Sequence, residues 1–180
     1  KFQDTVVIAG CGPLGLGMVA AARVNGAARI IALDLSDERL VVAQRTGAHL
    51  GINPKKEEAV KKVLDLTDGY GCDVYIEATG HPAAVEQGLM MIRKLGTFVE
   101  FCVMREKVTV DWTVIGDTKE LNIHGSHLGP RCYPVAIQMI EQGLLPMDEI
   151  VTHRLPLTEF QKGIDLVISG LTSVKVTLEP

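Results

Sequence analysis

The amino-acid sequence predicts an α/β fold in which a doubly wound, parallel six-stranded sheet is covered by helices on both faces. Three observations lead to this prediction. Short runs of β-branched and apolar residues alternate with helix-type patterns along the chain. A Gly-x-Gly-x-x-Gly sequence, at Gly10, Gly12 and Gly15, follows the first apolar run, and the second run ends in the carboxylate of Asp34.

The first strand, Val6–Ala9, leads into a turn and a helix of small residues. Gly10 permits the tight turn, Gly12 keeps side-chain atoms away from a bound pyrophosphate, and Gly15 lets the helix pack closely on the strand. Pro13 is tolerated because a first-turn N–H has no helical partner. The helix start offers free N–H groups to phosphates. This stretch predicts a dinucleotide site, although a glycine-rich turn also occurs in other α/β proteins.

The second strand, Arg29–Asp34, supports the dinucleotide prediction because it ends in the carboxylate of Asp34, about 20 residues beyond the last glycine. A carboxylate there accepts hydrogen bonds from the adenosine ribose hydroxyls and repels a 2′-phosphate, which favours NAD over NADP. Arg39, in the first turn of the next helix, lies on the ribose side. It either contacts the ribose or phosphate or remains a solvated cation.

The remaining strands and helices alternate as right-handed crossovers require. Further strands are expected at Ala48–Asn53, Cys72–Ala78, Gly96–Val103 and Leu121–Gly125, and helices at Asp37–Thr46, from Pro54, from Pro82, and at Pro134–Gln142. Thr79 and Gly80 would then stand at the same sheet edge as the glycine turn and form a wall for the adenine. Residues 1–145 are predicted to form this dinucleotide-binding domain.

Residues 146–180 fit the six-stranded plan less well. Two strands are expected, at Ile150–Leu155 and Ser173–Leu178, with a helix between them that Thr158 would open and Gln161 would support in a capping box. The sheet does not need this strand-helix-strand tail. The tail is therefore expected to pack elsewhere, against a partner domain.

Composition and charge exclude several classes of protein. The 180-residue chain is 47% hydrophobic and 22% charged, which excludes disorder, and its net charge of −4 favours neither nucleic acid nor an anionic membrane as partner. The uncharged run Val6–Ala22 is broken by glycines and a proline, so it predicts a strand, turn and helix rather than a membrane span. No signal peptide is expected at the N-terminus. Four scattered cysteines favour thiols in a reducing cytoplasm.

Several segments together resemble the C-terminal part of the zinc-dependent medium-chain alcohol dehydrogenases. They are VVIAGCGPLGLG, IIALDLSDERL, DGYGCDVYIEATG, KLGTFVEF and VTHRLPLTEFQKGIDLVISG. The segment LNIHGSHLGPRCYP favours the polyol branch, which includes sorbitol, threonine and erythritol/threitol dehydrogenases. The resemblance implies a Rossmann fold and hydride transfer between NAD and a small secondary alcohol or polyol.

The resemblance also implies roles for individual residues. The cofactor contacts that it implies are the pyrophosphate turn (Gly10, Gly12, Pro13, Leu14, Gly15), the ribose site (Asp34, Arg39), the adenine side (Ala78, Thr79), the nicotinamide side (Phe101, Val103, with backbone groups of Phe101, Asn122 and His124 on the carboxamide) and Lys175 at the pyrophosphate. Cys102 departs from the family pattern, which has a small residue there. The details of the nicotinamide contacts are therefore left open.

In this family the zinc ligands, a cysteine and a His-Glu pair, belong to an N-terminal catalytic domain. No CxxC or His-Glu dipeptide occurs in this sequence, so we expect no catalytic or metal-ligating residue here. The chain is therefore expected to be a fragment that binds the cofactor but is inactive alone. Its tail is expected to pack on the N-terminal domain. His127 follows the predicted sixth strand and could face the substrate.

The same residues are also compatible with two other functions. One is a stand-alone NAD-sensing domain without catalysis, and the other is an S-adenosylmethionine-dependent methyltransferase. Gly15 and the dehydrogenase-like ending argue against the methyltransferase, and the lack of a Tyr-x-x-x-Lys pair argues against a short-chain dehydrogenase. The predicted sixth strand, Leu121–Gly125, would be an apolar sheet edge, which predicts a homodimer or homotetramer.

Overall fold

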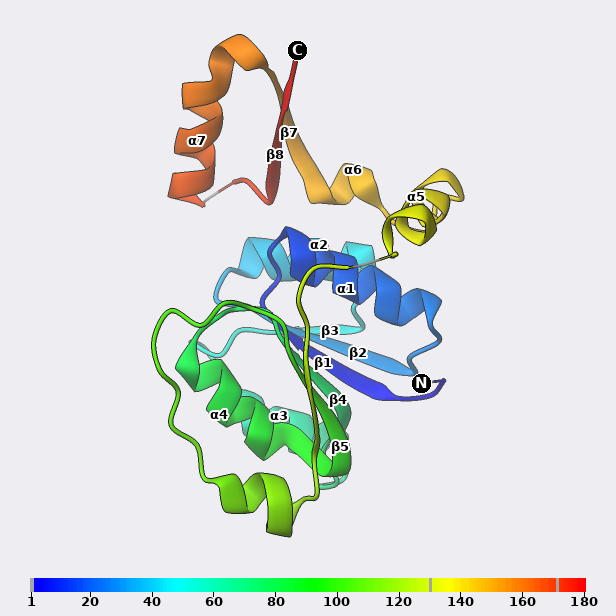
Figure 1. Cartoon of the computed structure of the whole chain (residues 1–180), viewed down its shortest axis with the longest axis vertical. Helices are drawn as coiled ribbons and strands as arrows, with labels where there is room; N and C mark the ends of the chain where they lie inside the picture. Colours follow the sequence, from blue (N-terminus) through cyan, green and yellow to red (C-terminus); the bar gives the residue numbers. More distant parts are fainter. Residues whose placement is uncertain (1, 130, 171) are drawn as a thin grey trace.

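Six parallel strands form the central sheet in the spatial order β3-β2-β1-β4-β5-β6 (Figure 1). The computed structural model describes residues 2–129, 131–170 and 172–180. The strands are β1 (Thr5–Ala9), β2 (Arg29–Leu33), β3 (Leu50–Ile52), β4 (Cys72–Glu77), β5 (Ile92–Glu100) and β6 (Asn122–Gly125). The predicted doubly wound sheet is confirmed. Its strand order reverses between β1 and β4, where the carboxyl ends of the strands leave a crevice for a ligand.

Helices cover both faces of this sheet (Figure 1). On one face lie α1 (Pro13–Val24) and α2 (Asp37–Thr46), and on the other α3 (Ala59–Leu66) and α4 (Pro82–Met91). The chain also forms α5 (Tyr133–Glu141), α6 (Met147–Ile150) and α7 (Phe160–Ser169), a π-helical turn η1 (Val114–Thr118) and a 3-10 turn η2 (Leu157–Glu159). Successive strand residues point to opposite faces. In β1, Val7 joins the core with Tyr75 and Phe98, whereas Ile8 joins the core with Leu16.

Local signals place two of the helices as predicted. The Ser36 hydroxyl accepts a hydrogen bond from Arg39 N at 3.3 Å, so it caps α2, and Gly47 ends that helix with a φ of +128°. Pro82 begins α4, and the His81 ring accepts a hydrogen bond from the backbone of Ala83. Both helices follow strands directly, which fixes their N-termini at the carboxyl edge of the sheet.

Several predicted boundaries were wrong. Pro54 does not open a helix, because the Asn53 side chain accepts a hydrogen bond from Lys55 N and holds a turn there. Helix α3 begins only at Ala59. Strand β5 runs over Ile92–Glu100 instead of Gly96–Val103, so Phe101 and Val103 lie in the segment that leaves the sheet.

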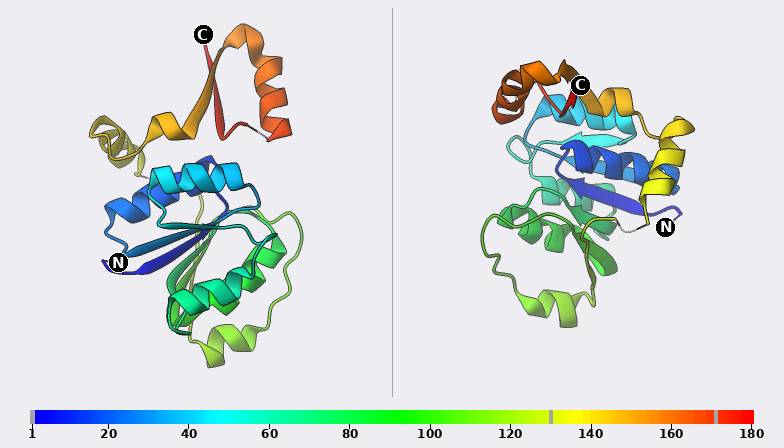
Figure 2. Two further views of the ribbon diagram at one scale, coloured as in Figure 1. Left: turned by 180° about the vertical axis from the view of Figure 1, so that it is seen from behind. Right: turned by 45° about the horizontal axis from the view of Figure 1, so that its top comes forward.

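The tail forms a second, two-stranded parallel sheet from β7 (Val151–Pro156) and β8 (Lys175–Glu179), with α7 between the strands. The predicted capping box does not form: α7 begins at Phe160 without a side-chain cap, and the Gln161 amide donates to Asp165. Figure 2 shows this sheet and α7 projecting beyond the layer of α1 and α2.

The start of the tail is anchored to the first part of the chain. Ile150, in α6, is buried in the same core cluster as Leu40 and Ala43. Glu149 forms an ion pair with Arg45 of α2, with 3.7 Å between their charged atoms. The residues after the predicted boundary at position 145 therefore pack first on this chain's own helices. Across the described parts of the chain, no helix has the length and apolar character needed to cross a membrane.

Candidate cofactor-binding site

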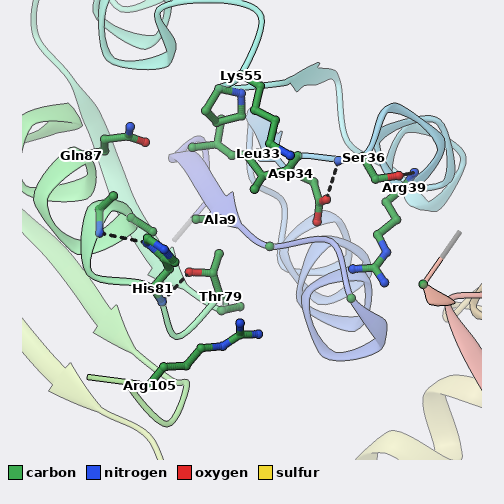
Figure 3. Close-up of a pocket in the computed structure, with 18 of the residues that line it drawn as sticks. Ala9, Leu33, Asp34, Ser36, Arg39, Lys55, Thr79, His81, Gln87 and Arg105 are labelled. Carbon is green, nitrogen blue, oxygen red and sulfur yellow. Dashed lines mark hydrogen bonds between the residues drawn. The ribbon is translucent and has the colours of Figure 1, made fainter. Parts of the chain in front are cut away.

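A cavity of about 610 Å³ opens at the carboxyl ends of β1, β2 and β4, in the crevice where the strand order reverses (Figure 3). Of the residues predicted to bind a cofactor, it is lined by Gly10, Gly12, Asp34, Arg39, Ala78 and Thr79. Figure 3 shows Leu33, Asp34, Ser36 and Arg39 on one wall and Thr79, His81, Gln87 and Arg105 on the other. The structure thus brings Gly10 and Gly12 of the predicted pyrophosphate turn together with the residues predicted for the ribose and the adenine, whereas Gly15 does not line the cavity.

The three glycines of the turn have different physical roles. Gly10 has a φ of +98°, and a Cβ there would lie 2.6 Å from the Ala78 carbonyl oxygen. A Cβ on Gly15 would lie 1.8 Å from the carbonyl oxygen of Gly10. A Cβ on Gly12 would meet no atom within 4 Å. Gly10 and Gly15 are therefore required by packing, whereas Gly12 borders open space at the N-terminus of α1, where a diphosphate would fit.

Asp34 is held in position by two backbone N–H groups. Its Oδ2 atom accepts a hydrogen bond from Cys11 N at 2.7 Å, and its Oδ1 atom accepts one from Ser36 N at 2.9 Å. Each carboxylate oxygen can accept a further hydrogen bond, so two adjacent hydroxyls could be bound. Burial, assisted by the negative charge of Asp34, raises the pKa of the Cys11 thiol far above its usual range, so this thiol stays protonated.

Arg39 and Asp34 line the same end of the cavity (Figure 3). The Nε atom of Arg39 is buried and has no hydrogen-bond partner within the described residues. Gly170, which follows α7, lines the same cavity, and its φ of +61° is left-handed. The tail therefore reaches the end of the cavity where Arg39 lies, which no local motif in the sequence indicated.

Sequence reasoning also missed the buried carboxylate of Glu77 at the end of β4. Its Oε1 atom accepts hydrogen bonds from Thr79 N at 2.7 Å and from Gly80 N at 3.1 Å. Glu77 thereby fixes the turn that places Ala78 and Thr79 in the wall of the cavity. The signal in the sequence was a carboxylate directly after the apolar run Val74–Ile76, since a buried carboxylate is costly unless it is hydrogen-bonded.

A second cavity, of about 450 Å³, lies where β5 and β6 end. It is lined by Glu100, Phe101, Cys102, Val103, Gly125, Ser126 and His127. Phe101 and Val103, predicted for the nicotinamide, thus share a cavity with His127. Burial and the carboxylates of Glu77 and Glu100 raise the pKa of the Cys102 thiol, which disfavours a thiolate there.

Some predicted site residues lie outside both cavity linings. Asn122 and His124 are on β6 with exposed side chains, and the Asn122 amide donates to the Leu95 carbonyl at 3.5 Å. Lys175 begins β8 in the tail sheet, and its carbonyl accepts a hydrogen bond from Thr152. Pro13 and Leu14 form the first turn of α1, where the Leu14 side chain is 63% exposed.

Further lining residues escaped the sequence analysis because they carry no motif. They are Pro54 and Lys55 after β3, His81, Ala84 and Gln87 at the start of α4, and Arg105 after β5. Each follows a strand of the parallel sheet, which is the signal that could have found them. In the described part of the chain, no group of three histidine, cysteine or acidic side chains gathers closely enough to hold a metal ion.

The sequence and the fold of this chain are both similar to those of known dehydrogenases. A family described as zinc-binding dehydrogenase matches residues 13–142. An erythritol/L-threitol dehydrogenase of Mycolicibacterium smegmatis is 59% identical over 99% of this chain and 49% of its own length. The structure of 2R,3R-butanediol dehydrogenase from Bacillus subtilis matches with a TM-score of 0.92 and 27% identity. The match covers 100% of this chain and 52% of the butanediol dehydrogenase chain.

A third relative is a short chain alcohol dehydrogenase from Escherichia coli CFT073, solved with NADH. Its TM-score is 0.91 at 27% identity, over 99% of this chain and 52% of its own. This chain thus spans about half the length of the relatives that it matches. The predicted resemblance is confirmed, and the similarity to an erythritol/L-threitol dehydrogenase agrees with the polyol branch. The chain belongs to the zinc-binding dehydrogenase family.

Proposed function

We propose that this chain binds NAD(H) and forms the cofactor-binding half of an NAD-dependent alcohol or polyol dehydrogenase. The observation that carries the proposal is the placement of Asp34. Its carboxylate is fixed by Cys11 N and Ser36 N in the wall of a cavity that also includes Gly10 and Gly12. The ribose diol at Asp34 and the diphosphate at the glycine turn would both belong to the adenosine diphosphate part of a single bound dinucleotide.

The preference for NAD over NADP follows from charge. A 2′-phosphate on the adenosine ribose would stand against the Asp34 carboxylate and repel it. Arg39 partly offsets this repulsion, but Asp34 already uses one lone pair on each oxygen for the backbone. Its remaining acceptor capacity suits hydroxyl donors and offers nothing to a phosphate, which also only accepts.

The nicotinamide is assigned to the second cavity. A dinucleotide that leaves the glycine turn toward β5 would reach the ends of β5 and β6, where Phe101 and Val103 stand. Bound NAD supplies the hydride acceptor, and the alcohol is oxidised to a carbonyl compound as its hydroxyl proton is released. In this proposal Phe101 and Val103 contact the nicotinamide ring. The zinc that the family implies is proposed to be held by residues outside this chain.

The substrate class rests on the relatives alone. An erythritol/L-threitol dehydrogenase that is 59% identical favours a small polyol over a simple alcohol. Pro13, Leu14, Asn122, His124 and Lys175 remain proposed cofactor contacts. They would reach the ligand through backbone groups or after adjustment of the tail, since they lie outside both cavity linings.

Titration calorimetry with NADH, NADPH and S-adenosylmethionine tests the cofactor assignment. We expect NADH to bind with at least about tenfold higher affinity than NADPH, a difference of about 1.4 kcal/mol. Binding of S-adenosylmethionine alone would overturn it. Oxidation of erythritol and L-threitol with NAD, assayed in the protein produced from its complete reading frame, tests the activity. Tight NADH binding with no polyol or alcohol oxidation there would favour an NAD sensor.

We also propose that the protein self-associates through β6 as a homodimer or homotetramer. This strand is the outermost of the sheet, its four residues are exposed, and its free edge can pair with another strand. We place the protein in the cytoplasm, because Cys11 and Cys72 are kept as buried thiols, the state that reducing compartments maintain.

A further inference from the structure

Arg105 is an arginine of the first cavity with no ionic partner in the described chain. Its backbone N–H donates to the Gly80 carbonyl at 3.2 Å, but no hydrogen bond or ion pair of its side chain occurs within the described residues. The side chain is exposed. Figure 3 shows it beside Thr79, on the wall opposite Asp34 and Arg39.

The backbone around Arg105 is held tightly against the turn after β4. A Cβ on Gly80 would lie 2.6 Å from the Val103 carbonyl oxygen, so only a glycine lets the two segments approach this closely. The Gly80 carbonyl then accepts the hydrogen bond from Arg105 N. Glu77 in turn fixes Gly80 by accepting its N–H. The Cα of Arg105 is therefore placed by two backbone contacts with Gly80 and by the Glu77 carboxylate that holds Gly80, rather than by a free loop.

Arg105 stands at the junction of the two cavities. The segment after β5 contributes Phe101, Cys102 and Val103 to the second cavity and Arg105 to the first. In a ligand whose adenosine occupies the first cavity and whose nicotinamide occupies the second, the part that crosses this junction is the diphosphate. The N-terminus of α1 faces the diphosphate from one side with neutral N–H groups, and a cation on the opposite side would complete its neutralisation.

We propose that Arg105 binds the diphosphate of the cofactor, from the side opposite the glycine turn. This inference rests on the proposed function. Two other cations line the first cavity, Arg39 and Lys55, and Figure 3 places both on the wall of Asp34, at the ribose end. A planar guanidinium can donate two parallel hydrogen bonds to phosphate oxygens, which a lysine cannot.

The test compares Arg105→Gln and Arg105→Lys with a matched control, Lys107→Gln. Lys107 is also an exposed cation, two residues further along, but it does not line either cavity. Titration with NADH, ADP-ribose and adenosine separates the contacts, because only the first two contain the diphosphate. Thermal unfolding without ligand confirms that all three variants fold, as expected for substitutions of exposed side chains.

We expect Arg105→Gln to lower the affinity for NADH and for ADP-ribose about tenfold and to leave the affinity for adenosine within about twofold of the wild type. Arg105→Lys should recover part of the affinity, and Lys107→Gln should bind as the wild type. Equal affinity of Arg105→Gln and Lys107→Gln for NADH would overturn the inference while the proposed function stands. An equal loss of adenosine binding would also overturn it. A wild type that binds no NADH would overturn the proposed function, and the inference with it.

Discussion

The Oδ2 atom of Asp34 accepts a hydrogen bond of 2.7 Å from the backbone N–H of Cys11. The carboxylate at the end of β2 is thus tied to the glycine turn that follows β1. The Asp34 carboxylate, which would bind the ribose hydroxyls, also fixes the glycine turn, which would bind the diphosphate. Two parts of the proposed site, separated by more than 20 residues in sequence, are coupled through one side chain.

The first prediction concerns cofactor choice. Asp34→Ala removes the acceptor of the ribose hydroxyls and the charge that repels a 2′-phosphate. NADH affinity should fall about tenfold or more, and the preference over NADPH should shrink by a similar factor. Titration of both cofactors measures it, with Asp65→Asn, an exposed acid on α3, as control. An unchanged ratio of the two affinities would contradict the ribose role of Asp34.

The second prediction separates binding from folding at the glycine turn. Gly12→Ala adds a methyl group where there is open space but replaces the N-cap glycine of α1, so stability should fall by at most about 1 kcal/mol while NADH binding is lost. Gly15→Ala places a Cβ 1.8 Å from the Gly10 carbonyl oxygen and should lower the free energy of unfolding by about 2 kcal/mol or more without any ligand. Thermal unfolding and NADH titration of both variants check this. A Gly12→Ala variant that binds NADH normally would argue against a diphosphate at the turn.

The third prediction concerns the end of α4. The Lys119 ammonium group donates hydrogen bonds to the carbonyls of Leu89 at 2.6 Å, Met90 at 3.1 Å and Ile92 at 2.7 Å. Lys119→Met should lower the free energy of unfolding by about 1–3 kcal/mol, since these carbonyls lose a charged donor. Denaturant unfolding measures the change, and the exposed Lys107→Met should be neutral. Equal stability of the two variants would show that water replaces the ammonium group without cost.

The fourth prediction concerns acid stability. Burial of the Asp73 carboxylate would raise its pKa, but hydrogen bonds from Thr5 N at 2.7 Å and Arg93 Nε at 2.6 Å outweigh this and lower the pKa below the usual 3.8. The stabilisation is therefore complete above the unfolded-state pKa and is lost as the pH falls through the lower folded-state value. Below about pH 5 the wild type should lose stability more steeply with acid than Asp73→Asn, as urea unfolding at several pH values would measure.

Asp65→Asn serves as the control for this pH series, because Asp65 is an exposed partner of Lys61 on α3. Because an exposed ion pair contributes little to stability, Asp65→Asn should unfold at close to the wild-type urea concentration at neutral pH. If the curves of Asp73→Asn and the wild type run parallel through the acid range, the contacts of Asp73 do not contribute to stability in this way.

The fifth prediction concerns association through β6. Ile123 is 45% exposed on this edge strand, and a lysine there would oppose strand pairing. Light scattering should give an oligomer for the wild type and a smaller mass for Ile123→Lys, with NADH binding retained in both. A wild type that remains monomeric at high concentration would refute the proposed interface.

The sequence by itself determined the sheet and the first half of the site. Alternating apolar strands and helices dictate parallel crossovers, and the spacing from Gly10 to Asp34 lies within one βαβ unit, so local rules place these residues together. Ser36 and Pro82 mark helix starts for the same local reason, and the structure confirms both.

Only the tertiary structure decided which distant segments complete the cavities. Arg105 and Gly170 line the first cavity because the segments after β5 and α7 fold back toward the carboxyl edge, and no short-range pattern encodes that approach. Glu77 fixes the wall of the first cavity because the turn after β4 donates backbone hydrogen bonds to its carboxylate, a contact that depends on how that turn packs. Helix caps and glycine turns depend on neighbouring residues, whereas these contacts depend on how whole elements pack, and packing is a property of the assembled core.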